Sequence, residues 1–152
     1  METPNLPVYS ALLGGTLLVA QTILMLGVGM YRTGAKKGVG VGDDMKLERI
    51  VRRHGNLAEN TAIFIVVLAI FELFFGQTGI ALWTASLFFV ARLMHVIGFS
   101  NNAGSHLAEA TGGGKVFVIM RASGAGLTAI SSLVLAIALL ISTIAASSFR
   151  VF

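Results

Sequence analysis

The segment Glu48–Glu59, ERIVRRHGNLAE, places charged and amide side chains directly before the apolar run TAIFIVVLAIFELFF. Arg49, Arg52, Asn56 and Glu59 follow one another at intervals of three and four residues, so on a helix they share one narrow stripe. Drawing such groups into a low-dielectric interior is costly unless partners satisfy them. The stripe therefore predicts a polar site at one end of an apolar helix.

Two later segments repeat this arrangement. Arg92, His95 and Phe99 are spaced by three and four residues, and Arg121 lies shortly after the start of the last apolar run. An ionisable side chain such as Arg92, about two turns inside an apolar segment, is by default a functional-site hypothesis. We expect three helices to direct these polar groups to the same end of the molecule.

The chemistry of such a site is limited by what the chain lacks. It has no cysteine, which excludes disulfides and a protein thiol nucleophile, so any sulfur chemistry must use a thiol supplied by a ligand. Three scattered histidines without cysteine give no metal-ligand spacing, and we expect no metal site.

The composition is that of a membrane protein. The chain has 152 residues, of which 55% are hydrophobic and 12% charged, and its mean hydropathy is +0.84. Soluble domains carry about 25% charged residues. The sequence therefore predicts an integral membrane protein.

Four apolar segments predict helices at about 8–31, 46–75, 80–99 and 116–144. At about 1.5 Å per residue each approaches or exceeds the roughly 30 Å of a hydrocarbon core. A Gly-rich polar loop, SNNAGSHLAEATGGG, separates the third from the fourth. Without an internal repeat or a second domain, we expect a single all-α domain over residues 1–152, a bundle of four transmembrane helices.

The basic residues indicate orientation rather than nucleic-acid binding. Seven Lys and Arg lie between Arg32 and Arg53, whereas the turn Gln77–Gly79 holds none. The positive-inside rule places the 32–53 connection in the cytoplasm. The 100–115 loop returns to that side, so the polar helix ends gather there.

Structural explanations compete with the functional one. Arg49 and Arg53 could simply reach lipid phosphates, and Arg52 could pair with Glu59 as a tie between helix turns. His95 alone would more often be a packing histidine. These explanations account poorly for the buried Arg92.

Other residues are expected to be structural. Glu72 lies opposite the polar stripe near the outer interface. Gly124 and Gly126 are most simply a close helix-packing face.

The motifs together resemble those of a known family. Four motifs are similar to those of the MAPEG family, whose members are membrane-associated proteins in eicosanoid and glutathione metabolism. They are YRTGAKK at the exit of the first helix, ERxxRxHxNxxE leading into the second, ARLMHxxGF at the end of the third and MRASGAGLT in the fourth. The RxHGN and RLMH forms look most similar to the bacterial branch. The resemblance implies a homotrimer in the bacterial inner membrane that binds glutathione as co-substrate between neighbouring subunits on the cytoplasmic side. It implies a transferase or peroxidase acting on lipophilic electrophiles that partition into membrane lipid.

The resemblance also assigns residues. On the second helix, the family's glutathione ligands match Arg52, Asn56 and Glu59, and their partners on the third helix match Arg92 and His95. The basic residue at the exit of the first helix matches Arg32. The arginine of the fourth helix that stabilises the thiolate matches Arg121. Arginine suits the two carboxylates of glutathione, and glutamate suits its ammonium. A cation beside the thiol would lower the thiol pKa from about 8.5.

Two positions depart from the family pattern. Phe99 stands where several relatives have a tyrosine that contacts glutathione, and Ala122 stands where the prostaglandin E synthase has a serine. The second departure argues against that isomerase chemistry. The family also contains a non-enzymatic lipid-binding protein, so a non-catalytic lipid binder is an alternative. A transporter using Glu59 and His95 as a proton relay is a third hypothesis, although the sequence lacks discontinuous helices or a repeat.

Overall fold

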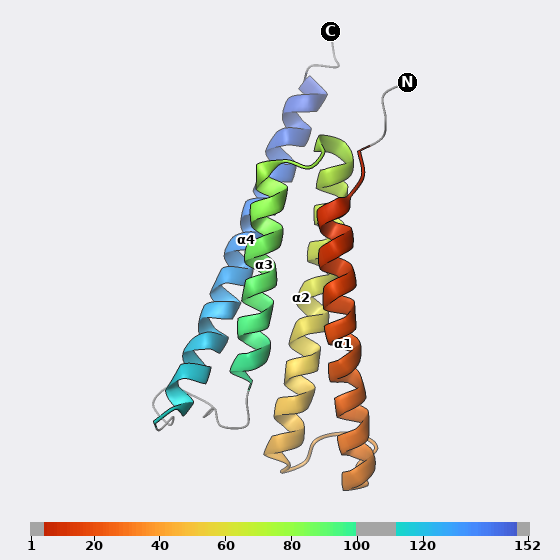
Figure 1. Cartoon of the computed structure of the whole chain (residues 1–152), viewed down its shortest axis with the longest axis vertical. Helices are drawn as coiled ribbons and strands as arrows, with labels where there is room; N and C mark the ends of the chain where they lie inside the picture. The colour runs from red at the N-terminus through yellow and green to blue at the C-terminus, as the bar shows by residue number, and fades with distance from the viewer. Residues whose placement is uncertain (1–4, 100–111, 149–152) are drawn as a thin grey trace.

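The computed structural model describes residues 5–99 and 112–148, and within them the chain forms four helices (Figure 1). These are α1 (Val8–Ala35), α2 (Met45–Phe75), α3 (Gly79–Gly98) and α4 (Gly114–Ser148). All four are long and apolar enough to cross a membrane. The expected all-helical class is confirmed, while residues 100–111 of the polar loop lie outside the described chain.

The predicted helix bounds differ from the observed ones mainly at the ends of α1 and α4. Each of these helices continues four residues further than the apolar run, to Ala35 and to Ser148. α1 ends where Lys36 takes a left-handed conformation, with φ of 53°. Backbone N–H groups of the following residues then bond the carbonyls of Arg32 and Thr33, which closes the helix.

The start of α2 is capped by Asp44, whose carboxylate accepts a hydrogen bond from the Leu47 N–H at 3.0 Å. This bond, with the nearby charge of Lys37, lowers the pKa of Asp44 below its usual value. The charged cap therefore helps to hold the loop between α1 and α2.

The helices are arranged as two pairs. α1 lies along α2, and α3 lies along α4 (Figure 1). Between the pairs is a core of buried apolar side chains in which the rings of Phe64 on α2 and Phe88 on α3 stack with their centroids 3.7 Å apart. Its buried members are Leu13, Leu17, Leu57, Phe64, Leu68, Phe71, Ala81, Ala85, Phe88 and Leu135.

α3 and α4 touch backbone to backbone at two glycines. A Cβ on Gly98 would lie 2.5 Å from the Arg121 nitrogen, and a Cβ on Gly124 would lie 2.7 Å from the Ala91 oxygen. Only glycine fits at either point. The expectation for Gly124 is thus confirmed. Gly126 takes no part in this contact, because a Cβ there meets nothing within 4 Å among the described residues.

Glu72 joins the other pair at the opposite end of the bundle. It is fully buried near the end of α2, and its two carboxylate oxygens accept the N–H groups of Tyr9 and Ser10 at 2.8 and 2.7 Å. Those N–H groups belong to the first turn of α1 and lack intrahelical acceptors. The negative charge also suits the positive end of the helix dipole. The structural role expected for Glu72 follows from these two bonds.

Candidate functional site

The stripe predicted on α2 faces a crevice between α2 and α4. Two cavities lie along it, and both are lined by Asn56. The arginine cavity, of about 270 Å³, is lined by Met45, Glu48, Arg49, Arg52, Asn56, Phe99 and Arg121. The histidine cavity, of about 410 Å³, is lined by Asn56, Glu59, Asn60, Ile63, Arg92, His95, Ala125, Thr128, Ala129 and Ser132. Six of the seven predicted site residues therefore line one or both of these neighbouring cavities, which together we call the crevice.

Arg92 crosses the bundle beneath this crevice. Its side chain is 2% exposed, and its guanidinium donates to the Asn56 carbonyl of α2 at 3.3 Å. It also donates to the Gly124 carbonyl at 3.4 Å and to the Thr128 hydroxyl, both on α4. The two terminal nitrogens of Arg92 thus find acceptors on its own chain, on α2 and α4.

His95 lies one turn further along α3 and is 8% exposed. Its Nδ1 is 2.9 Å from the Arg121 carbonyl oxygen. A carbonyl can only accept, so Nδ1 carries the proton and Nε2 of the neutral ring is an acceptor. Among the described residues, neither His95 Nε2 nor Arg92 Nε has a hydrogen-bond partner. Buried polar atoms without partners are uncommon and call for an explanation.

Arg121 is placed by the aromatic residue at the end of α3. Its guanidinium carbon lies 5.2 Å from the centroid of the Phe99 ring, within the range of a cation–π contact. The same ring makes an edge contact with His95, with centroids 5.2 Å apart. Phe99 therefore supplies a face for a cation at the position where the resemblance leads us to expect a hydroxyl.

The neighbouring arginines of α2 behave differently from one another. Arg52 is exposed, and its Nε lies 3.6 Å from a carboxylate oxygen of Glu48. It thus pairs with Glu48 rather than with Glu59, the partner that we considered. Arg53 donates through Nη2 to the Phe99 carbonyl, so within the protein it has a partner other than lipid phosphate.

Arg32 is the one predicted site residue outside the crevice lining. Its Nη1 donates to the Gly40 carbonyl at 2.8 Å and lies within 3.5 Å of the Lys37 and Gly38 carbonyls. Within the described chain it therefore holds the loop that follows α1. In this structure Arg32 does not line either cavity, unlike the other six predicted site residues.

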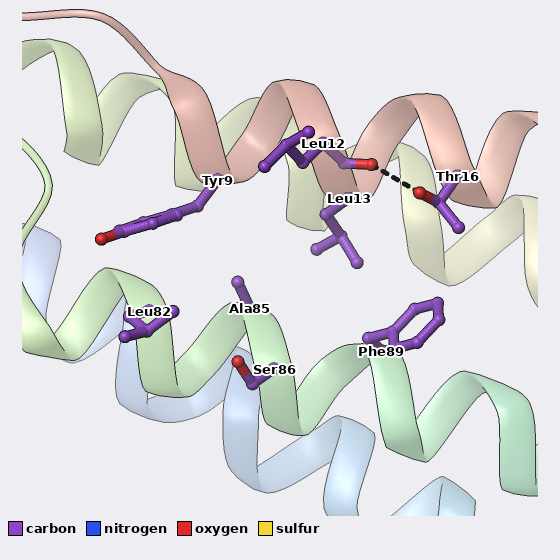
Figure 2. Close-up of a pocket in the computed structure, with 8 residues that line it drawn as sticks. All are labelled: Tyr9, Leu12, Leu13, Thr16, Leu82, Ala85, Ser86 and Phe89. Carbon is purple, nitrogen blue, oxygen red and sulfur yellow. Dashed lines mark hydrogen bonds between the residues drawn. The ribbon is translucent and has the colours of Figure 1, made fainter.

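Two further hollows lie between α1 and its neighbours. One, of about 230 Å³, lies between α1 and α3; Figure 2 shows that its lining is mostly apolar and that the Thr16 hydroxyl is bonded to the Leu12 carbonyl. The other, of about 480 Å³, lies between α1 and α2. It contains Gln21 Oε1 and Thr61 Oγ1, which are buried without a partner among the described residues.

Comparison with known proteins settles the family. The model of the MAPEG family matches residues 10–141, which include all four helices for most of their length. The chain belongs to the MAPEG family. A search of curated proteins finds no match to it. As a MAPEG protein with four long apolar helices, it is an integral, multi-pass membrane protein.

The MAPEG crevice contains residues that sequence reasoning missed. Thr128 accepts from Arg92 and lies seven residues after Arg121, hence on the same face of α4. Ser132 follows four residues later and lines the histidine cavity. The intervals of seven and four residues that place Thr128 and Ser132 on the face of Arg121 could have been read from the sequence. Gly98 could not be found in this way, because its contact depends on where α3 crosses α4.

Proposed function

We propose that this MAPEG protein is a glutathione-dependent transferase or peroxidase that acts on lipophilic electrophiles from the bilayer. The observation that carries the proposal is the charge distribution in the crevice. Arg49, Arg52 and Arg121 surround the arginine cavity, while Glu59 lines the adjoining histidine cavity. Glu48, which pairs with Arg52, also lines the arginine cavity. Glutathione has two carboxylates, one ammonium and one thiol, and three arginines with two glutamates offer partners for both kinds of charge.

The size and position of the crevice also support this ligand. The two adjoining cavities fall near the volume range of small-molecule pockets, which runs from about 300 to 1,000 Å³. Beside them the membrane-spanning helices present apolar surface from which a lipophilic substrate can enter. We place the crevice on the cytoplasmic side of a bacterial inner membrane, because the basic residues of the first connection lie at the same end.

Within this proposal each residue has a role. Arg52 and Asn56 bind the peptide, Glu59 binds its ammonium, and Arg92 with His95 holds α3 against α2 and α4 beside it. Arg121 lies close enough to the cavity to stabilise a thiolate, and its charge would lower the thiol pKa from about 8.5. The thiol proton leaves to solvent as the thiolate forms. The thiolate sulfur then bonds to the electrophilic carbon, and for a chloronitrobenzene the carbon–chlorine bond breaks and chloride leaves.

Binding is tested first by calorimetry and thermal unfolding of the detergent-solubilised protein. A millimolar ligand at about 10 mM adds roughly 1.4 kcal/mol of stability. No heat and no protection at that concentration would exclude glutathione.

Catalysis is tested with Arg121→Leu. We expect this variant to keep much of its glutathione affinity while the thiol pKa, followed by thiolate absorbance, moves toward the free value. Turnover of a chloronitrobenzene at neutral pH should fall about tenfold per pKa unit lost. Asn56→Ala is the matched control, with weaker binding and a smaller change in thiol titration. Unchanged rate and titration in Arg121→Leu would assign the thiolate to another residue.

The alternative function is a non-catalytic lipid binder. The apolar hollow of about 480 Å³ between α1 and α2 favours it, because such a groove suits an acyl chain. Binding of a fluorescent fatty acid without glutathione turnover would support this alternative, whereas turnover of the electrophile would contradict it.

We further propose that the protein is a homotrimer. Membership of the MAPEG family supports this proposal, because the resemblance implies three subunits that bind glutathione between them. Native mass spectrometry should show a trimer. A stable, folded monomer would contradict the proposal.

A further inference from the structure

The last turn of α3 holds Arg121 from three sides. The Gly98 Cα packs against the Arg121 backbone so closely that a Cβ would lie 2.5 Å from its nitrogen. The His95 Nδ1 donates to the Arg121 carbonyl at 2.9 Å, and the Phe99 ring lies 5.2 Å from its guanidinium carbon. The backbone and side chain of Arg121 must therefore follow any movement of this turn.

The same turn is tied to α2 by Arg53. The Nη2 of Arg53 donates to the Phe99 carbonyl at 2.5 Å. Carbonyls at the end of a helix lack intrahelical donors and carry the negative end of the helix dipole, so a guanidinium both satisfies and stabilises this one. Arg53 itself is not among the residues that line the arginine cavity or the histidine cavity. Its effect on the crevice is therefore indirect.

The bond from Arg53 to the Phe99 carbonyl joins the two walls of the arginine cavity. α2 supplies one wall of the arginine cavity through Arg52 and Asn56, and Phe99 with Arg121 supplies the other. Two arginines bridge the walls: Arg92 reaches the Asn56 carbonyl below the cavity, and Arg53 reaches the Phe99 carbonyl beside its mouth. Among the hydrogen bonds between described residues, these two join α2 to α3 at this end of the bundle, and loss of Arg53 removes the one at the last turn of α3.

We infer that Arg53 is a positioning residue that fixes the width of the arginine cavity and thereby holds Arg121 at the distance the reaction needs. This inference rests on the proposed function for its chemical consequence. Its structural consequence can be measured without any ligand. The two are tested separately.

The first experiment measures the width directly. Because the chain has no cysteine, Asp43→Cys and Lys115→Cys introduce the only two spin-label sites, both exposed and on opposite sides of the crevice mouth. Labelled chains are diluted with unlabelled ones, so that pulsed electron resonance reports one subunit's distance. Arg53→Met should lengthen or broaden the distribution, and Arg53→Lys should do so less. The matched control Lys46→Met removes a positive charge from the same helix and should leave the distribution unchanged. An unchanged distribution in Arg53→Met overturns the inference.

The second experiment asks whether Arg53 acts through Arg121. Arg53→Met should lower kcat/KM by about tenfold and raise the thiol pKa in the protein that retains Arg121, since small misplacements in a site are costly. In the Arg121→Leu background the same change should cost less than about twofold, because coupled residues are not additive. Equal losses in both backgrounds would show a general structural role and overturn the inference.

Two outcomes separate this inference from the proposed function. If the wild type neither binds nor turns over glutathione while Arg53→Met still changes the distance, the proposed function fails and the positioning role stands. If Arg53→Met does not fold, Arg53→Lys carries both experiments, since it retains charge but not the forked geometry. A wild-type distance and wild-type kinetics in Arg53→Lys, together with equal stability, would overturn the specific role of the guanidinium.

Discussion

Replacing Gly124 by alanine tests the closest contact in the structure. The added Cβ would lie 2.7 Å from both the Ala91 oxygen and the His95 nitrogen, about 0.7 Å short of the 3.4 Å at which ordinary contact begins. Both neighbours are backbone atoms of α3, so no side chain can rotate away, and the helices must separate. Overpacking of this kind costs about 1–3 kcal/mol. The bond from Arg92 to the Gly124 carbonyl is already 3.4 Å long and would break.

The assay is unfolding in mixed micelles, followed by helical circular dichroism and repeated with glutathione. Gly126→Ala is the matched control, because a Cβ there meets nothing within 4 Å and alanine is the better helix former by up to about 1 kcal/mol. We expect Gly124→Ala to unfold at a lower denaturant fraction and to bind glutathione more weakly, with Gly126→Ala at or above wild type. Equal stability of the two variants would refute the argument that α3 and α4 touch at Gly124.

Two further predictions concern the ends of the helices. Glu72→Gln should destabilise the protein by about 1–3 kcal/mol in thermal unfolding, because one of the two N–H groups at the start of α1 loses its acceptor; a wild-type melting temperature would contradict this. The Asp44 pKa is lowered by its bond from the Leu47 N–H, so the cap contributes stability above the unfolded pKa of about 3.9 and loses it as the pH falls through the lower folded value. Asp44→Asn, which caps without a charge, should be less stable than wild type at neutral pH and approach it in acid, where Asp44 is protonated; an unchanged acid limb would show that other carboxylates determine it.

The periodicity of the sequence was sufficient to predict the walls of the crevice but not the bonds across it. The stripe from Arg49 to Glu59 was visible because side chains on one helix face recur every three or four residues. The bond from Arg53 to the Phe99 carbonyl joins residues 46 positions apart, and no local pattern indicates such a pairing. From the sequence, contact with lipid phosphate was one of the explanations left open for Arg53.

The same limit explains Arg32 and the two glycines of α4. The motif that contains Arg32 predicted a ligand role, yet its guanidinium lies among carbonyls of the loop that follows it, an arrangement set by the turn after α1. Gly124 and Gly126 are equivalent by composition, and only the crossing of α3 and α4 determines which one meets the neighbouring helix.

The pairing of the helices has a mechanical consequence. Backbone contact at Gly98 and Gly124 joins α3 and α4 into one rigid body, and the Glu72 bonds do the same for the start of α1 and the end of α2. The short segment 76–78 joins the two bodies at the end of the bundle away from the crevice, and Gly76 there has φ of 75°. A wider crevice would therefore require one pair to rock about this hinge, rather than the displacement of a single helix. With α3 as a lever of about 30 Å, a rotation of about 5° opens the mouth by roughly 2.6 Å. A rotation that small would leave the stacked rings of Phe64 and Phe88, nearer the pivot, almost undisturbed.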